Sequence, residues 1–309
     1  MSILTLTFNP ALDVSAAVDH VSPNRKLRCD QPRYEPGGGG INVTAALKEL
    51  RCDSRAMYLC GGPPGQTLGK VLDHRGIDHI PIDIEGWTRS NFAVRDTSAG
   101  DQYRFVMPGP EVTDAEMDHF FEELRNLVPV PEYIVASGSL PPGIPAEIMK
   151  TLAATVRDMG ARLIADTSGN PLRMAAEQGV FLLKPNMNEL RDLTGADVST
   201  EDAQEKALNE LIDRGACEVA VLSLGAAGVL LTTSDTQKRL RAPSVPIASR
   251  VGAGDSMVAG ILAGFRRGYD IRNAVLLGVA AGSAAVMTKG TALCRCQDAE
   301  RLYENLTAG

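Results

Sequence analysis

The six residues from Val251 to Ser256 (VGAGDS) carry the clearest chemical signal in the sequence. Glycines on both sides of an alanine let backbone N–H groups approach a ligand closely, and the apolar run that follows, 257–265, predicts a buried helix. The start of a helix presents free N–H groups and a positive dipole, and both favour an anion. Asp255 falls in this first turn, where we expect the dipole to keep it ionised. A Gly-rich turn with an aspartate cap would produce the same letters, so the motif alone leaves both interpretations open.

Two better-known anion-binding motifs are excluded. A dinucleotide fingerprint requires a third glycine where this chain has Met257, and a P-loop requires a lysine that the stretch does not contain. Elsewhere, Gly69-Lys70 is followed by Val71, which is not a P-loop either. An anion-binding turn with a carboxylate and no lysine suits the activation of a hydroxyl beside a phosphate, because phosphoryl transfer depends on position and charge stabilisation more than on a strong base.

A second glycine-rich stretch precedes another helical pattern. Four consecutive glycines stand between Pro36 and Ile41, and the sequence 44–50 (TAALKEL) predicts a helix. Because each glycine costs folding entropy, we expect a ligand to approach this backbone, rather than packing to require the run. Asn42 lies in the first turn and can offer its amide to a sugar hydroxyl. An asparagine cap on a flexible loop is the alternative.

Composition limits the class of protein. The chain has 309 residues, of which 44% are hydrophobic and 22% charged, as in soluble globular proteins. The net charge of −7 and the absence of a Lys/Arg run argue against nucleic acid as a partner. No apolar run reaches transmembrane length and the first eight residues are too short for a signal peptide, so we expect a cytoplasmic protein without a membrane partner. Six cysteines without a Cys-x-x-Cys pair and four scattered histidines give no structural zinc pattern.

From Pro131 onward, short apolar strands alternate with helices, which predicts a parallel sheet. Polar residues follow the strand ends, where open α/β sheets bind their ligands. Strands are expected over 133–137, 162–165, 180–183 and 217–223, and helices over 145–159 and 272–287.

Four polar, alternating segments differ from this pattern and predict a small antiparallel sheet apart from the main body. They cover 13–21, 26–34, 90–95 and 102–107. Such a sheet would be half exposed, as a lid or a dimer contact. Arg89, Arg95 and Arg104 are spaced through it. Exposed strand arginines are usually solvated, but two that turn inward would clamp a phosphate.

Together these features resemble the ribokinase-like carbohydrate kinase family, in its phosphofructokinase B branch, over essentially the whole chain. The glycine run with Asn42 is similar to the first family signature, and the stretch that ends at Asp255 is similar to the second. The resemblance implies an α/β fold, a ribokinase-like three-layer sandwich with a mainly parallel central sheet and a small antiparallel β lid. It implies a single kinase domain over 1–309, with the lid formed from segments near 12–35 and 88–108.

Within this branch the chain is most similar to the minor 6-phosphofructokinase isozymes, through the segments 26–29, 35–42, 87–89, 102–109 and 137–143. The 1-phosphofructokinase and tagatose-6-phosphate kinase relatives usually have a lysine where this chain has Gly39, so the glycine favours a 6-phosphate sugar. The implied reaction is ATP-dependent phosphorylation of fructose 6-phosphate to fructose 1,6-bisphosphate. Phosphorylation of fructose 1-phosphate or tagatose 6-phosphate remains an alternative, as does a non-catalytic sugar- or nucleotide-binding regulator.

The resemblance also implies roles for individual residues. Asp255 is expected to take the proton from the acceptor hydroxyl. The other expected catalytic and substrate-binding residues fall into three groups: an anion hole for the moving phosphoryl group (Gly252, Ala253, Gly254), contacts to sugar hydroxyls (Asp13, Gly38, Gly39, Asn42), and contacts to the substrate phosphate (Lys26, Arg89, Arg104), with Ser139 beside the sugar or the phosphates.

On the nucleotide side, Lys184 is expected to face the phosphates of ATP. Asn186 and Glu189 would organise Mg²⁺ through water; the alternative for Glu189 is a solvated residue in the first turn of a helix. The ATP loop would include Ser223, Gly225 and Gly228.

The last expectations concern a monovalent cation and the oligomeric state. Carbonyls near Ser249, Val251, Ala285 and Gly290 resemble a potassium site. Arg250 replaces the threonine that is common in the family; it could weaken the ion, stand in for it, or point to solvent. The resemblance further implies a homodimer formed through the β lid.

Overall fold

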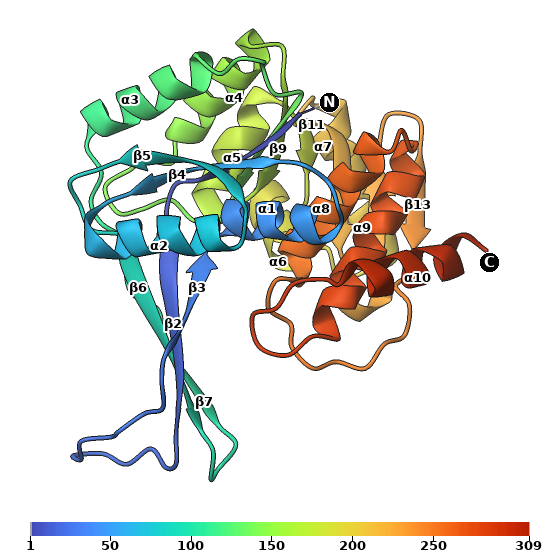
Figure 1. Cartoon of the computed structure of the whole chain (residues 1–309). Helices are drawn as coiled ribbons and strands as arrows, with labels where there is room; N and C mark the ends of the chain where they lie inside the picture. Colours follow the sequence, from blue (N-terminus) through green and yellow to red (C-terminus); the bar gives the residue numbers. More distant parts are fainter. Residues whose placement is uncertain (1, 309) are drawn as a thin grey trace.

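A nine-stranded sheet forms the centre of the computed structural model, which describes residues 2–308 (Figure 1). Its strands are parallel except at one edge, where β12 is antiparallel to both of its neighbours. In spatial order the strands are β13 (Gln237–Leu240), β12 (Val229–Thr232), β11 (Cys217–Ser223), β10 (Val180–Leu183), β9 (Arg162–Asp166), β8 (Tyr133–Ser137), β1 (Ile3–Thr7), β4 (Arg55–Cys60) and β5 (Asp78–Asp83).

The central strand β1 shows how the sequence produces the layers. All five of its residues are buried, because helices cover both faces of the sheet. Leu4 and Leu6 face one core, while the alternating threonines face helix α1 (Gly39–Glu49). Thr5 Oγ1 lies 2.6 Å from Thr44 Oγ1, and Thr7 Oγ1 accepts the N–H of Ile41 at 2.9 Å. The hydroxyls of β1 therefore fix the start of α1 against the sheet.

Helices cover the sheet on both sides, which gives three layers (Figure 1). The helices of one face are α3 (Asp114–Arg125), α4 (Ile148–Asp158), α5 (Gly169–Gln178), α6 (Met187–Thr194) and α7 (Glu201–Asp213). The other face carries α1, α2 (Gly62–His74), α8 (Ala253–Arg266), α9 (Ile271–Val286) and α10 (Cys296–Thr307).

A second, four-stranded sheet projects from this body (Figure 1). Its order is β3 (Arg33–Gly37), β2 (Ala11–Val18), β6 (Arg89–Asp96) and β7 (Gln102–Phe105), and we call it the lid sheet. The outer pairs are antiparallel as expected, but the central pair β2–β6 is parallel. The reason is topological: β2 follows β1, β6 follows β5, and both strands leave the body in the same direction.

The expected strand over 26–34 is wrong. Residues 19–32 contain no strand in the structure, and β3 begins only at Arg33. This segment is almost entirely exposed, and it includes Asn24 at a φ of 60° and Pro32, which has no N–H to pair. The alternating polar residues therefore form a solvated loop here and not a paired strand.

Within residues 2–308, no helix has the length and apolar character to span a bilayer. All six cysteines are free in the same part of the chain, and four of them are buried.

Candidate active site

Three charged side chains meet where the carboxyl ends of the parallel strands face the start of α8. Asp166 ends β9, Lys184 follows β10, and Asp255 lies in the first turn of α8. Lys184 Nζ is 2.9 Å from Asp166 Oδ1, and the two side chains are only 9% and 15% exposed. A Cβ atom added to Gly254 would lie 3.4 Å from the same Nζ, so the ammonium group rests against the first turn of α8.

Asp166 keeps Lys184 charged although the lysine is buried. Burial alone would lower the pKa of Lys184, but the charge and hydrogen bond of Asp166, together with the charges of Asp255 and Glu189, outweigh it, so its pKa is raised. Ser137 Oγ donates to the second oxygen of Asp166 at 3.3 Å. Asp166 was missed among the expected site residues. Its signal was its place directly after the predicted strand 162–165, which is where the other polar residues of the site also stand.

Asp255 has the environment of a general base. Its side chain is half-buried, and Oδ2 accepts a hydrogen bond from Asn42 Nδ2 at 2.9 Å. Burial and the nearby Asp166 raise the pKa of Asp255 to about 6, against the lowering effects of Asn42 and Lys184. The helix dipole was expected to keep this carboxylate ionised; its pKa is above the ordinary value but still leaves it mostly ionised at pH 7. A pKa near the working pH is what efficient proton transfer requires.

The turn before Asp255 is shaped to expose backbone N–H groups. Gly252 occupies the N-cap position of α8 with a φ of 73°, a conformation that side chains disfavour. Glycine offers no side-chain acceptor, so the N–H groups of Ala253 and Gly254 are left for an anion. A Cβ on Gly252 would also lie 2.6 Å from Leu293 Cδ2, so a larger residue here would displace the end of that side chain.

The glycine run before α1 has a packing reason, contrary to expectation. A Cβ on Gly39 would overlap Ser137 Oγ and lie 2.7 Å from the backbone nitrogen of Gly138. One on Gly40 would overlap the carbonyl oxygen of Leu6, and Gly38 has a φ of 118°. The chain's own strands β1 and β8 therefore approach this backbone closely, and the approach lets Asn42 reach Asp255.

Asn186 and Glu189 form a capping box at the start of α6. Asn186 Oδ1 accepts from the N–H of Glu189 at 3.0 Å, and Glu189 Oε2 accepts from the N–H of Asn186 at 2.8 Å. Burial raises the pKa of Glu189, against the hydrogen bond from Asn186 and the charge of Lys184. The helix-terminus role weighed as the alternative for Glu189 is thus present, and no hydrogen bond of the described residues uses Oε1. No cluster of three or more His, Cys, Asp or Glu side chains suited to a metal occurs in residues 2–308.

The turn after β11 lies beside this cap. The N–H of Ser223 donates to the carbonyl oxygen of Pro185 at 2.8 Å, and Ser223 forms an isolated bridge with Asn186. Gly225 begins an exposed 3₁₀ turn, and Gly228 has a φ of 101° against the backbone of Leu240. The structure therefore brings Ser223, the first of the three expected ATP-loop residues, next to the residues that follow β10, and the turn with Gly225 and Gly228 follows it directly in the chain.

The expected cation-binding residues also come close together. Ser249 Oγ donates to the carbonyl oxygen of Gly290 at 2.8 Å and accepts the N–H of Val251 at 3.2 Å. The carbonyl oxygen of Ala285 accepts from the hydroxyl of Thr288 at 2.7 Å. Two of the expected carbonyl ligands thus already have protein donors. Arg250 is exposed, which fits a side chain that points to solvent.

On the sugar side, Asp13 and Arg89 both have protein partners. Asp13 Oδ1 accepts from Asn91 Nδ2 at 2.8 Å. The guanidinium of Arg89 donates to the carbonyl oxygens of Asn9 (2.9 Å), Pro10 (3.3 Å) and Met107 (3.3 Å). Arg89 therefore ties together three chain segments at the base of the lid sheet.

The remaining expected phosphate ligands lie farther out. Lys26 and Arg104 are exposed, in the 19–32 loop and on β7 of the projecting lid sheet (Figure 1). Ser139 is exposed, and its Oγ accepts from Asn9 Nδ2 at 3.2 Å. Within residues 2–308, no hydrogen bond joins Lys26 or Arg104 to the Asp166–Lys184–Asp255 cluster.

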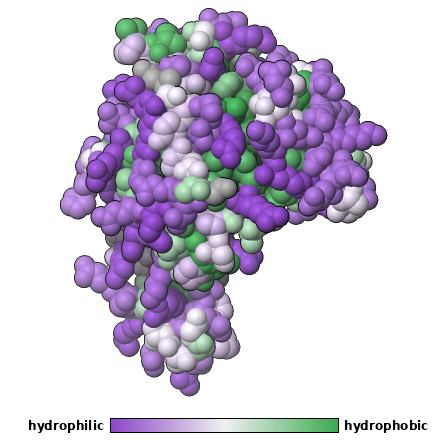
Figure 2. All heavy atoms as spheres, turned by 90° about the vertical axis from the view of Figure 1, so that its right-hand side faces the viewer, coloured by the Kyte–Doolittle hydropathy of each residue, from purple (hydrophilic) through white to green (hydrophobic). Residues whose placement is uncertain are grey.

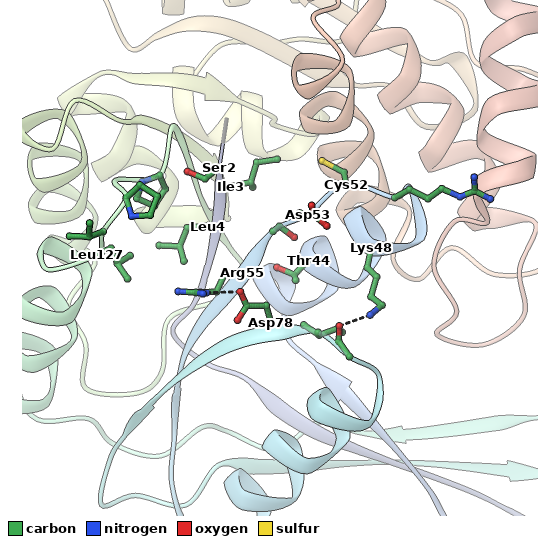
Figure 3. A pocket seen from close by; sticks show the side chains of 17 residues that line it. Ser2, Ile3, Leu4, Thr44, Lys48, Cys52, Asp53, Arg55, Asp78 and Leu127 are labelled. Carbon is green, nitrogen blue, oxygen red and sulfur yellow. Dashed lines mark hydrogen bonds and ion pairs between the residues drawn. The ribbon is translucent and has the colours of Figure 1, made fainter.

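A cavity of about 570 Å³ lies away from this site, at the amino ends of β1 and β4 (Figure 3). Three of its charged side chains are engaged with neighbouring groups. Arg55 Nε is 2.7 Å from Asp78 Oδ2, and Lys48 Nζ donates to the carbonyl oxygen of Gly76. This cavity contains none of the residues that the sequence singled out for catalysis or binding.

The chain is similar to known proteins over nearly its whole length. A model of the pfkB family of carbohydrate kinases matches residues 8–298, which include the glycine run and the Asp255 turn. The chain belongs to the pfkB carbohydrate kinase family. It is 45% identical over 302 residues to the ATP-dependent 6-phosphofructokinase isozyme 2 of Mycobacterium tuberculosis, an alignment that covers 98% of this chain and 89% of the relative.

More distant relatives include the 1-phosphofructokinase of Bacillus subtilis, 30% identical over 287 residues, with 93% of each protein covered. Among solved structures, phosphofructokinase-2 from Escherichia coli in complex with potassium superposes with a TM-score of 0.93 at 36% identity and covers 99% of both chains. The predicted ribokinase-like fold and the predicted family are therefore confirmed.

Proposed function

We propose that this pfkB kinase transfers the γ-phosphoryl group of ATP to the 1-hydroxyl of fructose 6-phosphate. The observation that carries the proposal is Asp255, which is held by Asn42 in the first turn of α8, close enough to Lys184 for the ammonium to act on its pKa. The name of the 45% identical relative bears out the sequence-based prediction of 6-phosphofructokinase activity.

In this proposal Asp255 accepts the proton of the attacking hydroxyl. Asn42 fixes the orientation of the carboxylate through its 2.9 Å hydrogen bond. Lys184 and the N–H groups of Ala253 and Gly254 stabilise the charge that develops on the transferred group. Asp166 holds Lys184 in position. The lid sheet excludes water from the sugar, which limits ATP hydrolysis.

Bound Mg-ATP would supply the phosphoryl group and the metal charge that neutralises it. The donor set fits such a group: Lys184 is cationic, Glu189 keeps one carboxylate oxygen for a metal-bound water, and Asn186 is exposed beside it. Because this chain offers no full cage of carboxylates in its described part, the ion would rely on water and phosphate oxygens, as Mg²⁺ commonly does. The turn of Ser223, Gly225 and Gly228 would border the nucleotide.

The sugar would lie between the lid sheet and the start of α1. Asp13, the backbone at Gly38 and Gly39, and Asn42 would contact its hydroxyls. The 6-phosphate would be bound by the cationic candidates and the nearby hydroxyl (Lys26, Arg89, Arg104, Ser139). Potassium would bind near the carbonyls of four residues (Ser249, Val251, Ala285, Gly290), a proposal supported by the Escherichia coli relative crystallised with potassium.

We also propose that the chain acts as one kinase domain and as a homodimer formed through the lid sheet. Strand register puts Asp13, Asn91 and Arg104 on one face of this sheet. The opposite face carries four aromatic side chains that are 40–52% exposed (Tyr34, Phe92, Tyr103, Phe105). Hydrophobic atoms appear on the lower lobe in Figure 2, which is the lid sheet. An exposed apolar sheet face of this kind favours pairing with a second copy. The cytoplasm, where Mg-ATP is abundant, is the proposed location.

The deciding experiment measures kcat/KM with Mg-ATP for fructose 6-phosphate, fructose 1-phosphate and tagatose 6-phosphate, with and without potassium. A clear preference for fructose 6-phosphate supports the proposal. A preference for another sugar phosphate would transfer the same chemistry to that substrate, and no turnover on any would favour the regulator. A Gly39→Lys variant is a poor test of specificity, because its Cβ would overlap Ser137.

A further inference from the structure

Within residues 2–308, a single hydrogen bond connects the lid sheet to the C-terminal part of the chain. Thr291 Oγ1, in the segment between α9 and α10, donates to Glu35 Oε2 of β3 at 2.7 Å. Among the hydrogen bonds of residues 2–308, no other joins the lid sheet to residues 241–308. The Glu35 side chain is 32% exposed, and its second oxygen is 3.5 Å from Arg75. A hydroxyl that donates to a carboxylate at this distance forms a charge-assisted bond, which is stronger than a neutral one.

On the lid side, this bond acts on the sugar-binding residues. Glu35 and Asp13 are directly opposite in the β2–β3 register, so both carboxylates lie on one face of the lid sheet. Like charges in such a pair repel each other. Thr291 and Arg75 engage Glu35, whereas Asn91 engages Asp13. The bond therefore draws Glu35 away from Asp13, which stays paired with Asn91.

The same strand leads directly to the catalytic base. β3 ends at Gly37, and α1 begins two residues later at Gly39. Asn42, in the first turn of α1, holds Asp255. A displacement of Glu35 would thus reach Asn42 along seven residues of continuous backbone.

On the other side, Thr291 belongs to a segment that braces the anion-binding turn. The preceding carbonyl, of Gly290, accepts from Ser249. Leu293 packs against Gly252, and the N–H of Cys294 donates to Ser256 Oγ at 3.3 Å. The segment 288–294 therefore contacts both ends of the VGAGDS stretch and also the residues where we place potassium.

We propose that Glu35 and Thr291 are positioning residues for phosphoryl transfer. Neither reaches the reacting atoms. Their bond aligns the sugar-binding lid with the anion-binding turn, and it passes changes in the segment 288–294, including potassium binding, to β3 and Asn42. The inference rests on the proposed function for its kinetic consequence, but the bond itself has a readout that needs no activity.

The test compares Thr291→Val, which removes the hydroxyl at nearly constant shape, with Thr291→Ser, which keeps it. Glu35→Ala and the double variant complete a mutant cycle. Thr307→Val is the matched control, because the hydroxyl of Thr307 bonds only to backbone carbonyls of its own helix. For each protein, kcat, KM for fructose 6-phosphate and KM for ATP are measured over a range of potassium concentrations.

We expect Thr291→Val and Glu35→Ala each to lower kcat on the order of tenfold, as the loss of one charge-assisted hydrogen bond allows, with KM for ATP within about twofold of the parent value. The double variant should lose no more than either single variant. Thr291→Ser and Thr307→Val should remain near the parent, and Thr291→Val should lose much of the response to potassium. An unchanged kcat in Thr291→Val, or losses that multiply in the double variant, would overturn the proposal.

Amide hydrogen exchange separates this inference from the proposed function. In Thr291→Val, the amides of residues 33–37 and 288–292 should exchange faster than in the parent protein, while those of α10 stay the same. If exchange at both segments is unchanged, the positioning role is refuted whether or not the protein is a kinase. If the parent phosphorylates no sugar but exchange responds as expected, the proposed function fails and the structural link remains.

Discussion

Replacement of Asp255 by asparagine should lower kcat strongly and, at neutral pH, stabilise the protein. The pKa of Asp255 is raised from 3.8 to about 6, because burial and Asp166 disfavour its charged form. Above pH 6 the ionised carboxylate therefore costs stability. The full shift corresponds to about 3 kcal/mol, and partial exposure of the side chain reduces it to about 1–3 kcal/mol. Asparagine removes the charge but keeps an oxygen that can accept from Asn42.

The pH dependence gives the sign of the effect. A carboxyl group whose pKa is higher in the folded state binds more protons there, so its cost is absent below about pH 3.8, grows as pH rises, and is complete above about pH 6. The stabilisation by Asp255→Asn should be largest at pH 7.5 and fall to about half at pH 5. At pH 7.5 we expect Tm to rise by about 2–6 °C.

The assay combines thermal unfolding between pH 5 and 8 with steady-state kinetics and ATP binding. Loss of the base should lower kcat by about 10²–10⁴, while ATP still binds. Asp118→Asn, at an exposed position of α3, is the control for removal of an ordinary carboxylate. If Asp255→Asn is less stable than the parent at pH 7.5, or if the stability difference does not change with pH, the reasoning about buried charge is wrong. Retained turnover would refute its role as the base.

Three further outcomes follow from the site and the lid. Lys184→Met should lower kcat by about 10². Because the ammonium of Lys184 lowers the pKa of Asp255, the variant should also shift the acidic limb of the pH profile of kcat/KM to higher pH. An unshifted limb would show that the two groups do not interact. Phe105→Lys should convert a homodimer to monomers in analytical ultracentrifugation, whereas an unchanged mass would place the interface elsewhere. Arg89→Ala should raise KM for fructose 6-phosphate at least tenfold and speed proteolysis within 90–107, because three carbonyl oxygens lose their hydrogen-bond donor. Slower turnover with a normal KM and normal protease resistance would contradict a role of Arg89 in holding the base of the lid sheet.

The body of the fold could be predicted from sequence because its strands are buried. The expected strands 133–137, 180–183 and 217–223 match β8, β10 and β11 residue for residue. Covered on both faces, these strands are short apolar runs whose ends are marked by polar residues. The lid strands are exposed, and their limits depend on which neighbours pair with them. The loop 19–32 and the parallel β2–β6 pair therefore did not follow from the local pattern.

The site could be predicted in its motifs but not in its contacts. The motifs located Asn42, Lys184 and Asp255 through their places at the starts of helices and the ends of strands. Asp166 was missed, because its role appears only when the neighbouring strand brings Lys184 to it. The sequence Asn186-x-x-Glu189 is itself a capping-box pattern, a signal that was available before the structure. For the glycine run, the sequence could not show whether a ligand or the chain's own strands come close to the backbone of these glycines.

The place of β1 at the centre of the sheet has a consequence for the order in which parts of the chain fold during synthesis. β1 pairs with β4 about 50 residues later and with β8 about 130 residues later, and Asn42 meets Asp255 only across 213 residues. Domains with such long-range pairing fold slowly, and chains are synthesised from the N-terminus. On the ribosome, β1, α1 and β4 can assemble while Asn42 still lacks its carboxylate partner. If the proposed roles of these residues hold, the nascent chain then carries sugar contacts without the base, and it cannot transfer a phosphoryl group from ATP before α8 has been translated and packed.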